Sequence, residues 1–329
     1  MLARLLQRLR VAMLAPILAG GVAGVAPAAL AQDWPNRPIT FVVPYGPGAS
    51  NDTFTRSVAE IMSRSLGQPV VVENRAGAGG STGSLSVARA EPDGYTFLEV
   101  PNSVVSYKPV MNVDLDPLAD LTPIGLMAKA PTAMVVPSSL PVTTVEEFIA
   151  YAKEHPDETF YGLTGIGTTQ HQHAELFNAQ TGLKLAGVNY KSSADAQTDL
   201  VGGRLQVMFV TVASVLGQIE SGQLRLLAYT DDNYPEGAPE APTMAEAGVL
   251  GMEGAQIFWG FFGPPGLPDD IKTRLNEELN KAVQDQSFQE LAAKTGATPA
   301  PGTPEDFIAT IEAESAALAE FLKTVDLQQ

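Results

Sequence analysis

Residues 42–52 read VVPYGPGASND, and they determine how the N-terminal part of the chain folds. They join an apolar run, Ile39 to Pro44, to a helical pattern that opens at Asn51 or Asp52 and continues as DTFTRSVAEIMSRSLG. A strand that leads through a glycine-rich loop into a helix is a common cradle for an anion, because the N–H groups of the first helical turn point at the loop. The stretch has neither Gly-Lys-Ser/Thr nor G-x-G-x-x-G, so it does not predict a nucleotide site.

The same alternation of strand and helix continues along the chain and predicts an α/β fold with parallel strands. Helices are indicated by the capping box Thr144-Val-Glu-Glu147, by an apolar stripe from Ile271 to Val283, and by Pro304 at a first helical position followed by a stripe from Phe307 to Val325. We expect strands at Ile39–Val43, Val70–Glu73, Tyr95–Val100, Ala133–Val136, Thr159–Gly162, Leu185–Asn189, Leu205–Val210, Leu224–Thr230 and Gln256–Phe262.

An irregular stretch at 104–123 separates the third expected strand from the next clear strand–helix unit. Such an interval suggests that the chain crosses to a second domain there, and a crossing followed by a return gives two lobes with a cleft between them. We expect domain I at 32–132 and 256–329, and domain II at 133–255.

The first residues have the pattern of a signal peptide. MLARLLQRLR carries three arginines and no acid, residues 11–31 carry no charge, and the segment ends in the small-x-small pattern Ala29-Leu30-Ala31. We expect 1–31 to be a signal peptide cleaved after Ala31, which places the protein in the periplasm; a retained membrane anchor is the alternative. Because the chain has no cysteine, disulfides and a lipid-modified N-terminus are excluded.

Composition limits the partners. The hydrophobic content of 45% is enough for a proper core. The formal net charge of −17 argues against nucleic acid and anionic membrane surfaces. An anion site in such a protein needs strong local dipoles.

Four loops that should join a strand to a helix are rich in glycine or in small hydroxyl residues. They lie at 45–52, 74–84, 163–171 and 189–197. Loops of this kind gather at the carboxyl ends of parallel strands, where ligands bind. One glycine loop is weak evidence, but four of them, two in each expected lobe, predict a cleft lined with hydrogen-bond donors.

Catalytic and metal sites find little support. His171 and His173 stand two positions apart, so on a helix they point in different directions and cannot share a metal; we expect His171 at the pocket rim and His173 in solvent. The carboxylate pair Glu146/Glu147 falls in a helix first turn, where the helix dipole explains it. We predict no catalytic residue, no metal and no cofactor.

Several stretches together carry a family signature. They are WPNRPITFVVPYGPGASNDTFTRSVAEIMSRSLGQPVVVENRAGAGGSTGSLSVARAEPDGYTFL, LDPLADLTPI, YGLTGIGTTQHQHAELFNAQTGLKLAGVNYKSSADAQTDLVGGRLQVMF, APTMAEAG and TPEDFIATIEAE. The chain resembles the receptors of the tripartite tricarboxylate transporters, also called the Bug family. The resemblance implies a type II periplasmic binding protein with two lobes, each a mostly parallel sheet flanked by helices. It also implies a receptor that closes on a small organic carboxylate and delivers it to membrane transporter subunits. We expect the protein to be a monomer.

In such receptors the carboxylate is held by main-chain N–H groups, hydroxyls and waters, with few or no charged side chains. Carried over by position, the resemblance implies a ligand site with contributions from both lobes, although Asp52 fits a helix cap better than a ligand contact. The site residues are Tyr45, Gly46, Ser50, Asn51, Asp52, Asn102 and Ser103 in the first lobe, and Gly165, Gly167, Thr168, Thr169, Ser192, Ser193, Asp195 and Val210 in the second.

Departures from the family pattern bear on specificity. The family often has an acid where this chain has Val210, and the usual Tyr-Lys-Gly reads Tyr190-Lys191-Ser192 here. Without that acid nothing obvious would pair with an ammonium group, which favours an aliphatic dicarboxylate or an aromatic acid as ligand. Tyr45, Phe209 and Trp259 could form apolar walls, although core packing is the ordinary role of such residues.

Two other functions stay open at this stage. The same receptor could present its ligand to a membrane signalling kinase, which the sequence does not separate from transport. A periplasmic enzyme on this scaffold would need an acid, a base and a nucleophile that converge on the cleft, and the sequence offers none.

Overall fold

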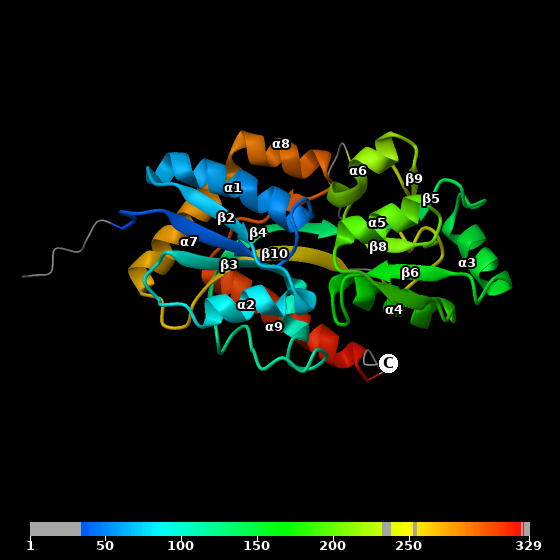
Figure 1. Ribbon diagram of the computed structural model, residues 1–329, viewed down its shortest axis with the longest axis horizontal. Coiled ribbons are helices and arrows are strands. Elements are labelled where there is room, and N and C mark those ends of the chain that lie inside the picture. The colour runs from blue at the N-terminus through cyan, green and yellow to red at the C-terminus, as the bar shows by residue number, and fades with distance from the viewer. Residues whose placement is uncertain (1–33, 232–237, 253–254, 324, 326–329) are drawn as a thin grey trace, which may run out of the picture. The chain divides into compact units, whose positions relative to one another are not determined.

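A computed structural model describes residues 34–231, 238–252, 255–323 and 325 (Figure 1). The expected signal peptide, 1–31, lies outside the described residues. Within the described part of the chain, no helix is both long and apolar enough to cross a bilayer.

The larger sheet has six strands in the order β11-β4-β10-β3-β1-β2. β1 pairs in parallel with β2 and β3, whereas β10 runs antiparallel to both β3 and β4. The strands are β1 (Ile39–Val43), β2 (Val70–Asn74), β3 (Thr96–Pro101), β4 (Thr122–Pro131), β10 (Gln256–Gly263) and β11 (Thr298–Pro299).

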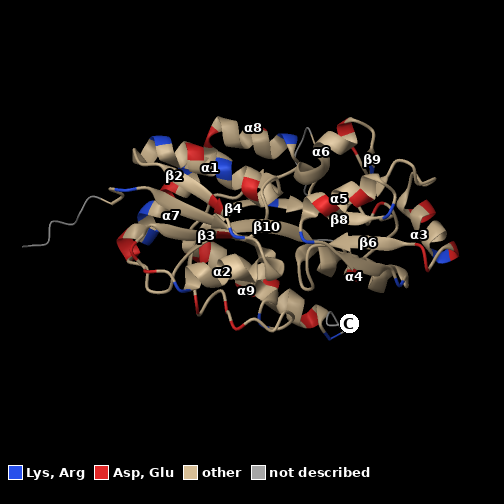
Figure 2. Ribbon diagram, in the orientation of Figure 1, with Lys and Arg blue, Asp and Glu red and all other residues tan. Residues whose placement is uncertain are grey.

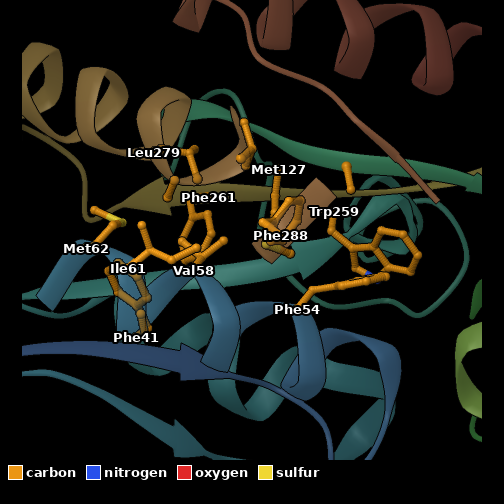
Figure 3. Close-up of a cluster of buried hydrophobic side chains, with 14 of the residues drawn as sticks. Phe41, Phe54, Val58, Ile61, Met62, Met127, Trp259, Phe261, Leu279 and Phe288 are labelled. Carbon is orange, nitrogen blue, oxygen red and sulfur yellow. The ribbon is translucent and has the colours of Figure 1, made fainter. Parts of the chain in front are cut away.

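Helices cover both faces of this sheet because its strands alternate apolar side chains between the faces. Phe41, Trp259 and Phe261 pack with α1, α7 and α8, as Figure 3 shows for Phe54 and Phe288. Val42 and Phe258 pack on the opposite face with α9. The helices are α1 (Ser50–Leu66), α2 (Ser81–Ala88), α7 (Asp269–Gln284), α8 (Gln286–Lys294) and α9 (Pro304–Phe321), with short 3₁₀ turns η1 (Ala78–Gly80) and η2 (Asn102–Ser106).

The second lobe is built on two smaller sheets. One has the order β8-β5-β9 and is antiparallel; the other pairs β6 and β7 in parallel, and a bridge from Tyr161 to Val207 links the two. A separate core around Phe148, Phe177 and Phe209 fills this lobe. Its elements are β5 (Ala133–Pro137), α3 (Val145–Glu154), β6 (Phe160–Leu163), α4 (Thr169–Thr181), β7 (Ala186–Asn189), α5 (Ser193–Val201), β8 (Met208–Val210), α6 (Val212–Glu220) and β9 (Leu224–Tyr229).

The chain crosses between the lobes at two neighbouring places. Thr132 alone separates β4 from β5, and the Thr132 N–H donates to Thr230 Oγ1 at 3.0 Å. The Thr230 N–H donates in turn to the Thr132 carbonyl at 2.9 Å. These bonds hold the outgoing and returning segments together, and we propose that the domain boundaries expected at 132/133 and 255/256 lie at this connection.

The fold class is confirmed as α/β with two lobes, but the six-stranded sheet of the first lobe is mixed and the three-stranded sheet of the second is antiparallel, rather than mostly parallel. The reason lies in the crossing: β4 leads out of the first lobe and β10 leads back, so neighbouring strands run in opposite directions. β4 itself was not predicted, because Pro, Gly and Ala make TPIGLMAKAP a poor strand by propensity. It forms because β10 and β11 pair with its two edges.

Candidate functional site

A cavity of about 1110 Å³ lies between the lobes. Loops 44–51, 76–80 and 110–113 line it from the first lobe, and loops 164–170, 189–194 and 209–211 line it from the second. Among the described residues, those that form its wall include no Asp, Glu, Arg or His, and Lys191 is the single charged one. Figure 2 shows where the charged residues lie instead, mostly along the outer helices and loops.

The N-termini of α1, α4 and α6 face this cavity without side-chain caps, whereas α5, which also begins at the cavity, is capped by Ser192. The N-cap residues of α1, α4 and α6 are Ala49, Thr168 and Thr211, and none of the three makes a side-chain cap bond. All three residues line the cavity. By contrast, α3 and α9, whose first residues do not line the cavity, are capped by Thr144 and Thr303. The first-turn N–H groups of α1, α4 and α6, with the partial positive charge of a helix N-terminus, are therefore available to an anion.

Tyr45 fixes the first-lobe wall. Its hydroxyl donates to the Gly79 carbonyl at 3.2 Å and lies 3.1 Å from Ser103 Oγ. Burial raises the pKa of Tyr45 to about 12, only partly offset by the bond with Ser103, so the phenol is a neutral group near pH 7. It joins the strand-end loop after β1 to the glycine turn before α2.

Asp52 holds the loop of residues 44–51 in place. Its carboxylate accepts bonds from the Gly48 N–H and from Asn74 Nδ2, both at 3.0 Å, and pairs with Arg56 at 2.8 Å. Burial opposes its ionisation, but the bonds from Arg56, Gly48 and Asn74 outweigh burial and lower the pKa of Asp52. The expectation that Asp52 holds the loop rather than the ligand fits this geometry.

Asn51 and Glu99 form a buried pair beneath the same loop. Asn51 lines the cavity, and its Nδ2 lies 3.1 Å from each carboxyl oxygen of Glu99. Burial raises the pKa of Glu99 to about 8, against the effect of the Asn51 bond, and the charge of Asp52 raises it further. Sequence reasoning did not single out Glu99, because a lone acid within an apolar strand does not indicate which residues of other elements will contact its carboxyl group.

In the second lobe, the loop between β6 and α4 is held by its own polar groups. Thr168 Oγ1 donates to the Gly165 carbonyl at 2.7 Å, and the Gly167 N–H donates to His171 Nδ1 at 3.0 Å. Burial lowers the pKa of His171, so its ring is neutral and can accept this bond. The N–H groups of the α4 first turn then remain for a ligand.

His173 corrects an expectation. It is 6% exposed rather than solvated, and its Nδ1 lies 2.7 Å from Thr132 Oγ1 at the connection between the lobes. Burial lowers the pKa of His173 to about 4. The ring is buried because α4 packs its inner face against β8 at this point.

Three side-chain bonds join the lobes across the cavity. Ser50 Oγ bonds to Thr211 Oγ1. Thr169 Oγ1 donates to Asn102 Oδ1 at 2.9 Å, and Gln172 Nε2 donates to Ser106 Oγ at 2.7 Å. The backbones also approach closely, since a Cβ on Gly165 would lie 3.2 Å from the Gly79 Cα. The lobes are therefore in contact, as in the closed form of a two-lobed receptor.

The cavity brings together most of the predicted site residues. Those that do not line it each have another role: Asp52 holds the first loop, Gly167 bonds to His171, Asp195 caps α5 with Ser192, and Asn102 receives Thr169 from the other lobe. The residues that line it are Tyr45, Gly46, Ser50, Asn51, Ser103, Gly165, Thr168, Thr169, Ser192, Ser193 and Val210.

The aromatic walls were predicted only in part. Tyr45 and Phe209 line the cavity, whereas Trp259 is fully buried in the core of the first lobe. Sequence reasoning also missed Met111 and Thr211 as lining residues. Met111 lies in the irregular stretch 104–123, where no pattern marks a wall; the uncharged Thr211 after β8 could have been found from its place before a helix.

Comparisons with known proteins place the chain among receptors of one kind. Residues 54–327 match the family model described as "Tripartite tricarboxylate transporter family receptor". Protein BugT of Bordetella pertussis is 35% identical over 286 residues, which cover 86% of this chain and 87% of BugT.

Solved structures agree with this similarity. An R. palustris protein solved with adipate superposes with a TM-score of 0.85 at 34% identity, covering 89% of this chain and 98% of that one. MatC from Rhodopseudomonas palustris, solved with bound malate, gives a TM-score of 0.81 at 25% identity over 88% of this chain and 99% of MatC.

Proposed function

Because this chain belongs to the tripartite tricarboxylate transporter receptor family, we propose that it captures a small organic carboxylate between its lobes and delivers it to a membrane transporter of that type. Receptors of this family bind a solute and are not enzymes. The proposal places the protein in the periplasm, the location of the structurally similar periplasmic binding protein BugD. It also takes the receptor to act as a monomer.

This proposal rests on a cavity that hydrogen-bond donors line and that, among the described residues, has no Asp or Glu in its wall. The uncapped N-termini of α1, α4 and α6 meet at it, and no Asp or Glu of the described part of the chain lines it. A carboxylate gains several charge-assisted N–H bonds there without a fixed counter-charge. Release for delivery is easier than from a site with a bidentate arginine, because no strong ion pair must be broken.

The lining also bears on the class of carboxylate. An amino acid would bring an ammonium group, and Val210 offers it no partner. An aliphatic dicarboxylate or an aromatic acid is therefore favoured. Relatives solved with adipate and with malate support the dicarboxylate choice.

Thermal-shift and calorimetric titration against a panel of acids tests the proposal. The panel contains adipate, malate and benzoate, with glutamate as the ammonium-bearing control. A true ligand at one hundred times its Kd should stabilise the protein by about 2.7 kcal/mol. Binding of glutamate in preference to all the other acids, or of no acid at all, refutes the proposed ligand class. Delivery is tested by ligand uptake into cells with and without the receptor.

A further inference from the structure

A buried carboxyl lies one side chain away from the cavity. Glu99 of β3 is 0% exposed, and both of its oxygens lie 3.1 Å from the Nδ2 of Asn51. Asn51 belongs to the first turn of α1 and lines the cavity. A ligand bound at the N-terminus of α1 would therefore lie close to the Asn51 amide, which already contacts the carboxyl of Glu99.

The surroundings of Glu99 give its negative charge no cation. The elements β1, β10, α2 and η2, which pack against β3, contain no Asp, Glu, Lys, Arg or His. From α1, the acid Asp52 faces Glu99, and Arg56 is paired with Asp52 at 2.8 Å. The other ionisable neighbours are the phenols of Tyr45 and Tyr107, whose pKa values burial raises. Among the described residues, Glu99 makes no ion pair.

We propose that carboxylate binding in this cavity is coupled to a proton on Glu99, so that the receptor takes up one anion together with the neutral form of this side chain. The inference rests on the proposed function. Two negative charges that share one amide and one helix end in a poorly screened interior repel each other, and protonation of Glu99 removes this repulsion. Asn51 then keeps its position, and the N–H groups at the N-terminus of α1 stabilise only the negative charge of the ligand.

Linkage turns this arrangement into a measurable pH dependence. Burial raises the pKa of Glu99 to about 8, so in the free protein the group is mostly neutral at pH 7 and mostly ionised at pH 9.5. If the bound form requires the proton, the apparent Kd rises about tenfold per pH unit above the midpoint, or roughly 30-fold between pH 7 and pH 9.5. Proton uptake on binding rises over the same range.

Three ionisable groups near the site, Tyr45, His171 and His173, do not account for a pH dependence in this window. Burial raises the pKa of Tyr45 to about 12, above the range of the measurement. Burial lowers the pKa values of His171 and His173, so both rings are neutral throughout. Adipate, the probe, carries both negative charges at pH 7 and above.

The experiment is a calorimetric titration with adipate from pH 6.5 to pH 9.5 in two buffers of different ionisation enthalpy, which gives both Kd and protons taken up. Malate replaces adipate if adipate gives no heat. Glu99→Gln keeps the shape and an acceptor for Asn51, and should show a flat Kd and no proton uptake. Glu314→Gln removes another carboxyl of the first lobe, partly buried and bonded to Asn102 at 2.7 Å, and should keep the wild-type pH dependence.

Each outcome decides the matter. A flat wild-type profile, a slope retained in Glu99→Gln, or a slope lost equally in Glu314→Gln overturns the inference alone. Carbon-13 NMR of the free protein tests Glu99 without a ligand: its carboxyl should titrate near pH 8, and an ordinary midpoint near pH 4 also overturns it. Failure of every acid in the panel to bind at pH 7 refutes the proposed function and the inference with it.

Discussion

The bond between Thr169 and Asn102 offers a sharp test of closure. Thr169 Oγ1 belongs to the second lobe and donates at 2.9 Å to Asn102 Oδ1 in the first. Asn102 is 1% exposed, and its Nδ2 is already engaged by Glu314 at 2.7 Å and by the Gln256 carbonyl at 3.2 Å. The amide is therefore fixed in the first lobe, and Thr169 is the partner that closure brings to it.

Thr169→Val removes this bond while keeping the shape of the side chain and the backbone N–H of α4. In the closed form Asn102 Oδ1 then loses its partner while still buried, whereas in an open form water can reach it. An unsatisfied buried acceptor costs about 1–3 kcal/mol, so Kd should rise roughly 5- to 150-fold while the open form keeps its stability. Most of the change should appear as faster ligand release.

Calorimetry and stopped-flow fluorescence measure these quantities with the acid that binds in the panel. Thr181→Val is the matched control, because Thr181 donates to the Phe177 carbonyl at the other end of the same helix. If Thr169→Val binds within twofold of the wild type, the contact does not belong to the ligand-bound form and the reasoning on closure is wrong.

Three further predictions follow from the cavity and its floor. Trp259 packs against Phe54 at 5.0 Å between ring centroids and lies two residues from the cavity-lining Ile257. We therefore expect a saturable change in intrinsic fluorescence with ligand, which Trp259→Phe abolishes and Trp34→Phe retains. Constant emission while calorimetry shows binding contradicts this prediction. Lys191→Met should weaken adipate about tenfold but leave hexanoate unchanged, because only adipate brings a second charge to this cation; equal effects on both acids count against a dicarboxylate site. Gly165→Ala should weaken binding by about 1–3 kcal/mol, since φ is +147° there and the Gly79 backbone approaches on closure; an unchanged Kd by calorimetry removes that close approach from the bound form.

The N-terminal strand, loop and helix show which parts of the fold short sequence patterns can predict. The apolar run, the glycine turn and the helix pattern of residues 39–67 predicted β1 and α1 closely, because each signal acts over a few neighbouring residues. The same holds for Thr144, which caps α3 as expected, and for Pro304, which is the first residue of α9 as expected. Hydroxyl and glycine loops at strand ends likewise indicated a donor-lined cleft before any side chain was placed.

Long-range pairing decided the rest. β4 was not predicted and becomes a strand only because β10 and β11 supply partners at its edges. His173 reads as solvated and is buried because α4 meets the connection at Thr132. Asn102 was assigned to the ligand, whereas its bonds go to Glu314 and Thr169, from segments far away in sequence.

The α/β alternation, the family and the donor chemistry of the loops could be predicted from the residues alone, since these depend on residue types at short spacing. The packed structure was needed to show which loops meet, that Lys191 is the single charged residue among the described ones on the cavity wall, and that Glu99 lies next to Asn51. The physical reason is that burial and a missing counter-charge arise from groups that several strands and helices bring together. No window along the chain contains them all.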